Sequence, residues 1–348
     1  MQPRIRMTSA VLAIVLLLGM AAAHSQASAP EGPGTTLFAD GSVLDIELTG
    51  PFATIMADTE ERKHQPMRLQ VGERTLDVEI RVRGNSRLRV CQFPPLRVYF
   101  GDDSAGTLFE GIKSLKLVTH CFDSKRGDRN LADEYAAYRI FSVLTPYGYR
   151  TRPARVTYRD TGGEQGDSAV VRYAFFLESR PLLADRIGGE RTNAQGIRLN
   201  ELQPDQAATM YIFQYLIGNT DWSLVTADTD KHCCHNVDLV SRDGLIYAIP
   251  FDFDLSGIVN APYAKPDPSL RIARVTTRRY RGYCIDAAYL SSALSRIQDR
   301  REAISYELRQ IPIAEADQIE DILRYLDGFF RQAEKADKLV ARFDNRCL

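Results

Sequence analysis

The sequence predicts an α+β protein with two lobes, the first rich in strands and the second rich in helices. Two observations lead to this prediction. Segments of alternating apolar and polar residues, the pattern of half-buried strands, dominate the chain up to about residue 180. After about residue 181 most segments have helical spacing, apart from one short hairpin. We therefore expect a strand-rich lobe over 37–180, a helical lobe over 181–348 and a hinge near 178–185.

The first residues have the composition of a secretory signal peptide. Two arginines precede an apolar run from Val11 to Met20, which is too short to span a hydrocarbon core of roughly 30 Å. Small residues follow, as they do at cleavage sites. We expect a signal peptide over 1–25, a polar Pro/Gly linker over 26–36, and a periplasmic or extracellular mature chain without a transmembrane span. An uncleaved membrane anchor is the alternative.

The cysteine content agrees with export. The six cysteines are an even number, which in an oxidising compartment favours disulfides. We expect Cys91 to pair with Cys121, since both fall in the N-terminal half. Cys233 and Cys234 are adjacent, so we expect each to pair with a distant cysteine. A zinc site is the competing interpretation for the cluster of His232, Cys233, Cys234 and His235, although these residues lack the usual ligand spacing.

Length and charge exclude some function classes. With 348 residues, the chain is long enough for an enzyme of two lobes. A formal net charge of −1 gives no basic excess of the kind that nucleic-acid binders carry. We expect no nucleic-acid partner.

In the first half, alternating apolar and polar residues mark the expected strands, and one segment has helical spacing. The expected strands are 42–50, 75–86, 93–100 and 114–120, followed by a helix over 130–144 and a strand pair over 153–160 and 169–179.

The second half begins with a strongly apolar helix. This helix is expected over 203–218, with Asp205 as its N-cap and Gly218 as its stop. Two strands, 236–241 and 245–255, follow around an Arg-Asp-Gly turn, which is a hairpin signal. The remainder of the chain is expected to be mostly helical.

Two acids in the sequence "IPFDFD" suggest a metal site. Asp252 and Asp254 stand two apart on an expected strand, so both carboxylates point to one face. Like charges on one face repel each other unless a cation lies between them. Oxygen ligands favour Mg²⁺ or Mn²⁺. The alternative is an exposed strand face with solvated acids.

Asp221 and Asn236 are the other candidates. Asp221 follows the apolar helix in a loop, where a rigidly held acid can accept a proton from a hydroxyl nucleophile. Asn236 opens the next strand, and its side-chain oxygen is a possible ligand of the same metal. The alternative is that Asp221 caps a turn and Asn236 only begins a strand.

Five stretches together resemble the spore-coat CotH kinase family of atypical protein kinases and, more distantly, the HipA-type kinases. They are "RVRGNSR" at 81–87, "SLKLV" followed by "DRNLADEYAAYRIF", "YAFFLES" at 173–179, "IGNTDW" at 217–222 and "IPFDFD" at 249–254. The resemblance covers roughly residues 75 to 260 and implies a kinase-like fold.

The resemblance implies catalytic and metal-binding roles. Asp221 would be the catalytic base, and Asn236, Asp252 and Asp254 would surround the metal. The span between Asp221 and Asn236 is longer than in the family. It contains the rival acids Asp228 and Asp230.

The resemblance also implies nucleotide contacts. Lys116 would hold the α/β-phosphates, and Glu134 on the next helix would keep the lysine aimed. Lys113 is the rival lysine. Arg83 would belong to a phosphate-covering turn, with a plain hairpin turn as the alternative, and Glu178 would lie near the adenine.

The expected function is that of an exported kinase, which transfers the γ-phosphoryl of ATP to a protein or small-molecule hydroxyl with Mg²⁺ or Mn²⁺. A catalytically inactive kinase-fold protein, with a binding or structural role in the cell envelope, is the alternative. Nucleotidyl transfer at the same site is a further alternative, because this reaction requires the same metal and phosphate contacts.

Overall fold

A computed structural model describes residues 34–162, 169–192, 197–225 and 233–348. The expected signal peptide over 1–25 and most of the expected linker lie outside the described residues. The described residues belong to one compact unit by their internal contacts.

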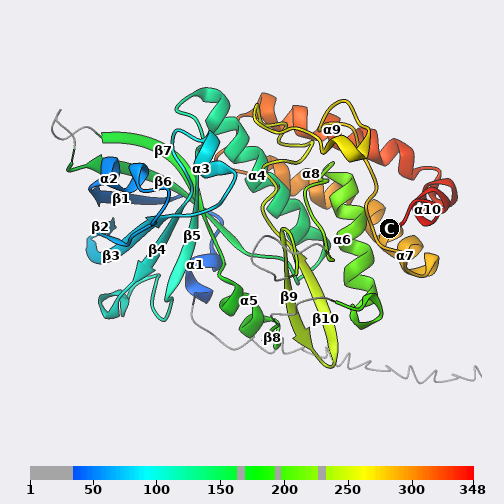
Figure 1. The fold of residues 1–348 in the computed structure, drawn as a ribbon, viewed down its shortest axis with the longest axis horizontal. Coiled ribbons are helices and arrows are strands. Elements are labelled where there is room, and N and C mark those ends of the chain that lie inside the picture. The colour runs from blue at the N-terminus through cyan, green and yellow to red at the C-terminus, as the bar shows by residue number, and fades with distance from the viewer. Residues whose placement is uncertain (1–33, 163–168, 193–196, 226–232) are drawn as a thin grey trace, which may run out of the picture. The chain divides into compact units, whose positions relative to one another are not determined.

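Seven strands close into a barrel (Figure 1). They are β1 (Leu44–Gly50), β2 (Gln65–Val71), β3 (Arg74–Val82), β4 (Leu96–Phe100), β5 (Ser114–Thr119), β6 (Thr151–Asp160) and β7 (Ala169–Leu177), in the order β1-β2-β3-β4-β5-β7-β6. All neighbours are antiparallel except β1 and β6, which run parallel and close the barrel. Alternate side chains, such as Leu48, Val98 and Leu117, fill the interior and are fully buried.

The two-lobed kinase-like fold expected from the sequence is wrong. The strand-rich half is a closed barrel, and the barrel and the helices belong to one compact unit. The closure depends on the parallel pairing of β1 with β6, in which Leu44 lies opposite Ala154. Such a long-range pairing leaves no signal in local hydrophobic periodicity, which is why the sequence did not predict it.

Helices and a small sheet make up the rest of the unit. The helices are α1 (Thr35–Ala39), α2 (Phe52–Ala57), α3 (Arg87–Val90), α4 (Lys125–Leu144), α5 (Arg180–Arg186), α6 (Pro204–Leu216), α7 (Ala287–Asp299), α8 (Arg301–Arg309), α9 (Ala316–Ala333) and α10 (Ala336–Asp344). The second sheet consists of β8 (Glu190–Arg191), β9 (Val237–Arg242) and β10 (Leu245–Pro250), in the order β10-β9-β8.

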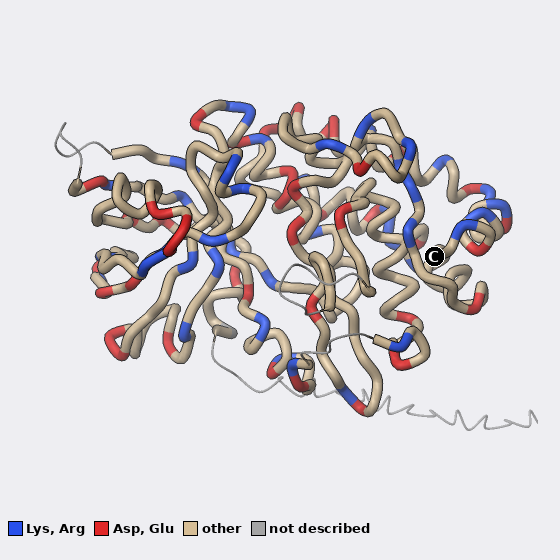
Figure 2. The backbone as a smooth tube through the Cα atoms, viewed as in Figure 1, with Lys and Arg blue, Asp and Glu red and all other residues tan. Residues whose placement is uncertain are grey.

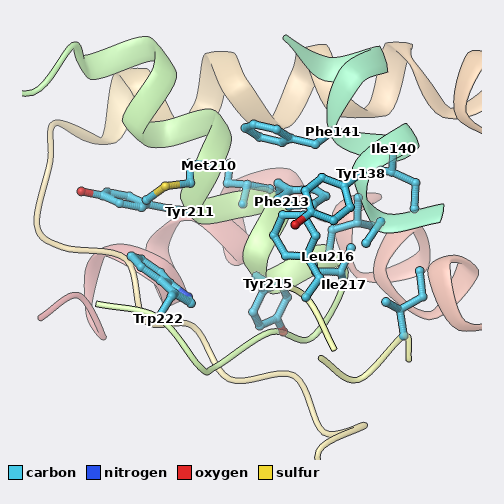
Figure 3. Packing of buried hydrophobic residues seen from close by; sticks show 14 of the residues in the cluster. Tyr138, Ile140, Phe141, Met210, Tyr211, Phe213, Tyr215, Leu216, Ile217 and Trp222 are labelled. Carbon is cyan, nitrogen blue, oxygen red and sulfur yellow. The ribbon is translucent and has the colours of Figure 1, made fainter. Parts of the chain in front are cut away.

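The helix α4 joins the barrel to the helical core. It contacts β6 and β7 on one side and α8 on another, whereas α6 contacts α7 and β10. Figure 3 shows aromatic side chains of α4 and α6 packed together, and the ring centroids of Phe141 and Phe213 lie 4.6 Å apart. Trp222 stacks on Tyr211 of α6 with a centroid distance of 5.7 Å. This apolar packing fixes the loop that follows α6 and carries Asp221.

Most of the expected elements are present, and two of the differences from the expected boundaries affect the site. The N-cap of α6 is Gln203, whose side chain accepts a hydrogen bond from the Gln206 amide, so Asp205 lies inside the first turn. The strand β10 ends at Pro250, so Asp252 and Asp254 lie beyond it rather than on it. The expected strand face for the two acids is therefore wrong.

Three disulfides pair all six cysteines. The expected bond between Cys91 and Cys121 is confirmed, and Cys284 pairs with Cys347. Cys233 and Cys234 bond to each other, so the expectation of distant partners is wrong. Their thiolates are thus not available to zinc. Disulfides of this number are compatible with an exported protein.

Charged residues of both signs occur along the barrel strands and the helices of the described chain (Figure 2). Among the described helices, none combines the length and the apolar character required to cross a membrane.

Removing the first disulfide tests its contribution to stability. The bond closes a loop with a sequence separation of 30 residues and joins the end of α3 to the end of β5. We expect the Cys91→Ser/Cys121→Ser variant to lose about 3 kcal/mol of unfolding free energy, because the unfolded chain gains conformational freedom. Urea denaturation of the oxidised wild type and the variant measures the difference. An unchanged denaturation midpoint would contradict it.

Candidate active site

The guanidinium of Arg87 lies at the centre of a cluster of three acids. Its Nη2 donates to Glu134 Oε2 at 2.5 Å and to Asp252 Oδ1 at 3.4 Å, and its Nε donates to Asp254 Oδ2 at 2.9 Å. Arg87 begins the short helix α3, Glu134 lies on α4, and the two aspartates follow β10. One side chain therefore ties together three segments that are distant in the sequence.

The acids of this cluster differ in burial and in pKa. Burial raises the pKa of Glu134 to about 7, against the opposing effect of Arg87. Burial also raises the pKa of Asp254, which accepts a second hydrogen bond from the Tyr263 hydroxyl at 2.9 Å. Burial opposes ionisation of Asp252 too, but Arg87 and the other nearby cations hold its pKa below the usual value. Asp252 is therefore the acid of the cluster that stays ionised most readily.

Asp252 has an unusual backbone conformation and a more exposed side chain than Asp254. Its φ of 62° lies in the left-handed region, and its amide donates to the Tyr138 hydroxyl at 2.9 Å. The Asp252 side chain is 33% exposed, whereas the Asp254 side chain is 6% exposed. Asp254 is thus committed to Arg87 and Tyr263, and Asp252 keeps an accessible carboxylate.

Asp221, Asn236 and His235 form a second polar group. Asn236 Nδ2 donates to Asp221 Oδ2 at 2.9 Å and to the Asp221 carbonyl at 2.8 Å. His235 Nε2 lies 3.0 Å from Asp221 Oδ1. The Asp221 amide is held by Asn219 Oδ1 at 3.0 Å. These contacts fix the orientation of the Asp221 carboxylate, which remains 34% exposed.

The two groups lie next to each other. The Phe251 amide donates to the Asn236 carbonyl at 3.0 Å, so Asp252 directly follows the residue that is bonded to Asn236. His235, which contacts Asp221, also helps to lower the pKa of Asp252. The structure thus brings Asp221, Asn236 and Asp252 to the same end of the β9–β10 hairpin.

Lys116 reaches the same region from the barrel. Its ammonium lies 4.2 Å from the ring centroid of Phe251, the residue before Asp252. Burial lowers the pKa of Lys116 to about 8, and the charge of Arg83 adds to this effect. The expected ion pair between Lys116 and Glu134 does not form between these described side chains, because Glu134 is bonded to Arg87.

A cavity of about 660 Å³ opens beside Lys116. Basic residues outnumber acidic ones in its lining, which includes Arg97, Lys113, Lys116, Arg180 and Arg191 together with the acids Asp185 and Asp238. Its volume falls within the usual range for small-molecule sites.

Arg97 on β4 lies opposite Lys116 on β5 and opposite Arg81 on β3. The three neighbouring strands therefore carry three positive charges in a row. Like charges on neighbouring strands repel, and an anionic ligand would relieve the repulsion.

Glu178 and Arg83 occupy different environments. Glu178 is buried and accepts hydrogen bonds from Arg186 Nε and Nη2 at 2.9 and 2.8 Å, so its carboxylate is not turned towards the cavity lining. Ser179 and Arg180, which follow Glu178, do line the cavity.

Arg83 is half-buried, and its Nε is a buried donor without a partner among the described residues. Its charge acts on both Asp252 and Lys116.

The donor set fits a hard divalent cation that is shared with phosphate. Among the described residues, no group of three His, Cys, Asp or Glu side chains is placed to hold a metal ion. The accessible carboxylate of Asp252 and the amide oxygen of Asn236, whose nitrogen is already bonded to Asp221, are hard oxygen donors. Mg²⁺ commonly takes only one or two protein carboxylates and completes its shell with water and substrate phosphates.

Some residues predicted for the site lie outside the two polar groups described above, and some residues within those groups were not predicted from the sequence. Lys113 is exposed on the cavity rim, and Asp228, Asp230 and His232 lie outside the described residues. The roles of Arg87, His235 and Tyr263 in these contacts were not expected. Arg87 is the last residue of the stretch "RVRGNSR", which was the one available signal for it.

No protein-family model matches the chain, and no curated protein matches it. Among solved structures it is similar to the Helicobacter pylori proinflammatory kinase CtkA, with 12% identity and a TM-score of 0.37, over 72% of this chain and 93% of that chain. A similarity at this level does not establish a shared fold or activity. The resemblance to CotH kinases therefore remains a prediction.

Replacing Arg87 tests the acid cluster. We expect Arg87→Met to lower the unfolding free energy by about 3 kcal/mol or more at pH 8, because it leaves buried carboxylates without their cation. A carboxyl whose folded-state pKa is raised is stabilising when protonated and loses that contribution as pH rises through the folded pKa. Glu134, with a pKa of about 7, and Asp254 behave in this way. The loss should therefore be smaller at pH 5.5 than at pH 8.

Urea denaturation at the two pH values measures this difference. The matched control is Arg89→Met, because Arg89 is exposed on the same short helix. Equal stability losses for the two variants at both pH values would rule out the central role of Arg87.

Proposed function

We propose that this protein is an exported, metal-dependent phosphotransferase that moves the γ-phosphoryl of ATP to a hydroxyl of a protein or small molecule. The observation that carries the proposal is the convergence of Asp221, Asn236 and Asp252 at one end of the β9–β10 hairpin. Lys116 lies over the ring of Phe251, the residue before Asp252, and it lines a basic cavity of about 660 Å³. A general base, hard oxygen ligands and a phosphate-binding lysine are the parts that phosphoryl transfer requires.

The nucleotide would occupy the cavity beside Lys116. The Lys116 ammonium would bind phosphate oxygens, and Arg97 would add charge from the neighbouring strand. Mg²⁺ or Mn²⁺ would be held by Asp252 and Asn236, and it would neutralise charge on the phosphates. Asp254 and Glu134 would act indirectly, since Arg87 binds both of them and also contacts Asp252.

Asp221 would act as the general base. Its oxygens are held by His235 and Asn236, yet a carboxylate keeps further acceptor sites, and the side chain is 34% exposed. The acceptor hydroxyl would give its proton to Asp221 while its oxygen bonds to the γ-phosphorus. The bond from the γ-phosphorus to the bridging oxygen would break, and ADP would leave. The fixed orientation of Asp221 would reduce the cost of aligning the base with the acceptor.

One observation favours a second candidate, a nucleotide-binding protein without catalysis. Glu134 is bonded to Arg87 and not to Lys116, so the ion pair that aims the phosphate-binding lysine in protein kinases does not form between these two described residues. In that case the protein would bind ATP with the metal, and no phosphoryl group would move.

Substitution of the acids separates binding from transfer. We expect Asp252→Ala to abolish metal-dependent ATP binding, and Asp221→Asn to keep binding and lose turnover by at least about a hundredfold. Incorporation of label from γ-labelled ATP measures turnover, and a thermal-shift titration with ATP and Mn²⁺ measures binding. The control is Asp243→Asn, because Asp243 is exposed in the turn of the same hairpin.

The possible results separate the candidates. Nucleotide binding without label transfer by the wild type would favour the inactive protein. Equal affinity for ATP and metal in wild type and Asp252→Ala would refute the proposed site. Mass spectrometry of the product distinguishes an added phosphoryl group from an added nucleotidyl group.

The pKa of Lys116 predicts a pH dependence of ATP binding. The ammonium is charged below its pKa of about 8, so its attraction for phosphate is present at lower pH and is lost as pH rises through and above 8. We expect ATP affinity to fall by about tenfold or more between pH 7 and pH 10, which corresponds to the loss of one charge-assisted contact. Titration calorimetry across this range measures it.

Two lysine variants identify the responsible residue. Lys116→Met should bind ATP weakly and show little of this pH dependence, whereas Lys113→Met should retain it. The reverse result would transfer the phosphate-binding role to Lys113.

A further inference from the structure

A second cavity of about 540 Å³ shares no lining residue with the one beside Lys116. Residues of α2, of the segments after α3 and β5, and of the strands β6 and β7 line it. They are Phe52, Ala53, Met56, Gln92, Phe93, His120, Asp123, Tyr158, Asp160 and Val170. Phe52 and Tyr158 also belong to the apolar core of the barrel, so the cavity extends from that core towards the surface.

The walls of this cavity are held in place by covalent and hydrogen bonds. The disulfide between Cys91 and Cys121 joins the two segments that supply Gln92 and His120. The amides of Gln92 and Phe93 both donate to the Cys121 carbonyl, at 2.9 and 3.2 Å. These bonds hold the backbone of the cavity walls in place, which lowers the entropic cost of binding.

Aromatic rings form much of the lining. Phe93 stacks on His120 with a centroid distance of 4.7 Å and an interplanar angle of 24°. Tyr158 lies 4.7 Å from Phe93 and 5.4 Å from Phe52, again between ring centroids. Such rings bind apolar groups, and their faces attract cations.

Two polar atoms of the lining residues are buried and have no hydrogen-bond partner among the residues that the structure describes. They are His120 Nδ1 and the Tyr158 hydroxyl, on residues that are 1% and 3% exposed. Leaving such groups unpaired is costly, and a ligand that hydrogen-bonds to them removes the cost. Burial lowers the pKa of His120 to about 4, so its imidazole is neutral and able to accept a hydrogen bond.

The charged side chains of the lining itself are acids, although the cation Arg172 lies close to His120. No lysine or arginine is among the lining residues, and its two acids are Asp123 and Asp160. Asp123 is paired with Arg172. Among the described residues, Asp160 accepts hydrogen bonds only from the amides of Gly162 and Ala53, at 3.0 and 3.4 Å, and no described cationic side chain pairs with it. An anionic ligand would be repelled here, and a cationic one attracted.

We propose that this cavity binds an organic cation, a protonated amine carried on a small apolar or aromatic body. The body would pack against the rings of Phe52, Phe93 and Tyr158. A small shift of the lining side chains would bring the ammonium within hydrogen-bond distance of His120 Nδ1 and the Tyr158 oxygen, which are buried in the structure, and its charge would be balanced by Asp160. The proposal is independent of the phosphotransferase activity.

Three probes of similar shape and different charge test the proposal. We expect benzylamine, protonated at pH 7, to bind the oxidised mature protein at about millimolar concentration, which is typical of a ligand of this size. Neutral benzyl alcohol should bind about tenfold more weakly, and anionic benzoate should not bind. Titration calorimetry measures the affinities. No binding of benzylamine at about 10 mM, or equal binding of all three probes, would overturn the proposal.

Two conservative variants locate the contacts. Tyr158→Phe should weaken benzylamine binding by about tenfold and leave the unfolding midpoint unchanged or higher, because the hydroxyl has no partner within the described chain. Asp160→Asn should weaken benzylamine binding but not benzyl alcohol binding. Tyr306→Phe is the control, since Tyr306 is 68% exposed on α8. Unchanged benzylamine affinity in both variants would place the amine elsewhere.

Discussion

The contact of one buried guanidinium with three carboxylates organises the candidate site. Arg87 is 5% exposed and reaches Glu134, Asp252 and Asp254 from a helix of only four residues. Carboxylates at such depth are strongly disfavoured unless a cation accompanies them. The positions of α3, of α4 and of the segment after β10 are therefore coupled. Without Arg87, the buried carboxyls of Glu134 and Asp254 would lose the cation to which they are bonded.

This contact changes how the paired aspartates are interpreted. Two acids two residues apart indicated a cation between them, and Arg87 supplies that cation for Asp254. The longer contact of Arg87 with Asp252, at 3.4 Å, and the exposure of that side chain leave Asp252 accessible to a ligand. A sequence pattern typical of metal sites thus contains one structural acid and one accessible acid. The contacts of Asn236 with Asp221 extend the accessible part of the site towards the β9–β10 hairpin.

The sequence predicted local features well and long-range ones poorly. Strand alternation, the helix around Glu134 and the hairpin after Asn236 follow from short-range patterns, and the structure contains them. The proximity of Asp221 to Asn236 was expected from the order of a loop acid, an asparagine and a hairpin, and the family resemblance implied it as well. The parallel pairing of β1 with β6 and the role of Arg87 depend on contacts between distant segments, which hydrophobic periodicity does not encode. The bond between adjacent Cys233 and Cys234 was missed because distant partners were assumed.

A crystal structure with Mn²⁺ and a non-hydrolysable ATP analogue would test the central claim most directly. The account predicts Mn²⁺ between the side-chain oxygens of Asp252 and Asn236, phosphates near Lys116, and the γ-phosphate facing Asp221. A nucleotide bound away from these residues, or a metal that does not contact Asp252, would contradict it.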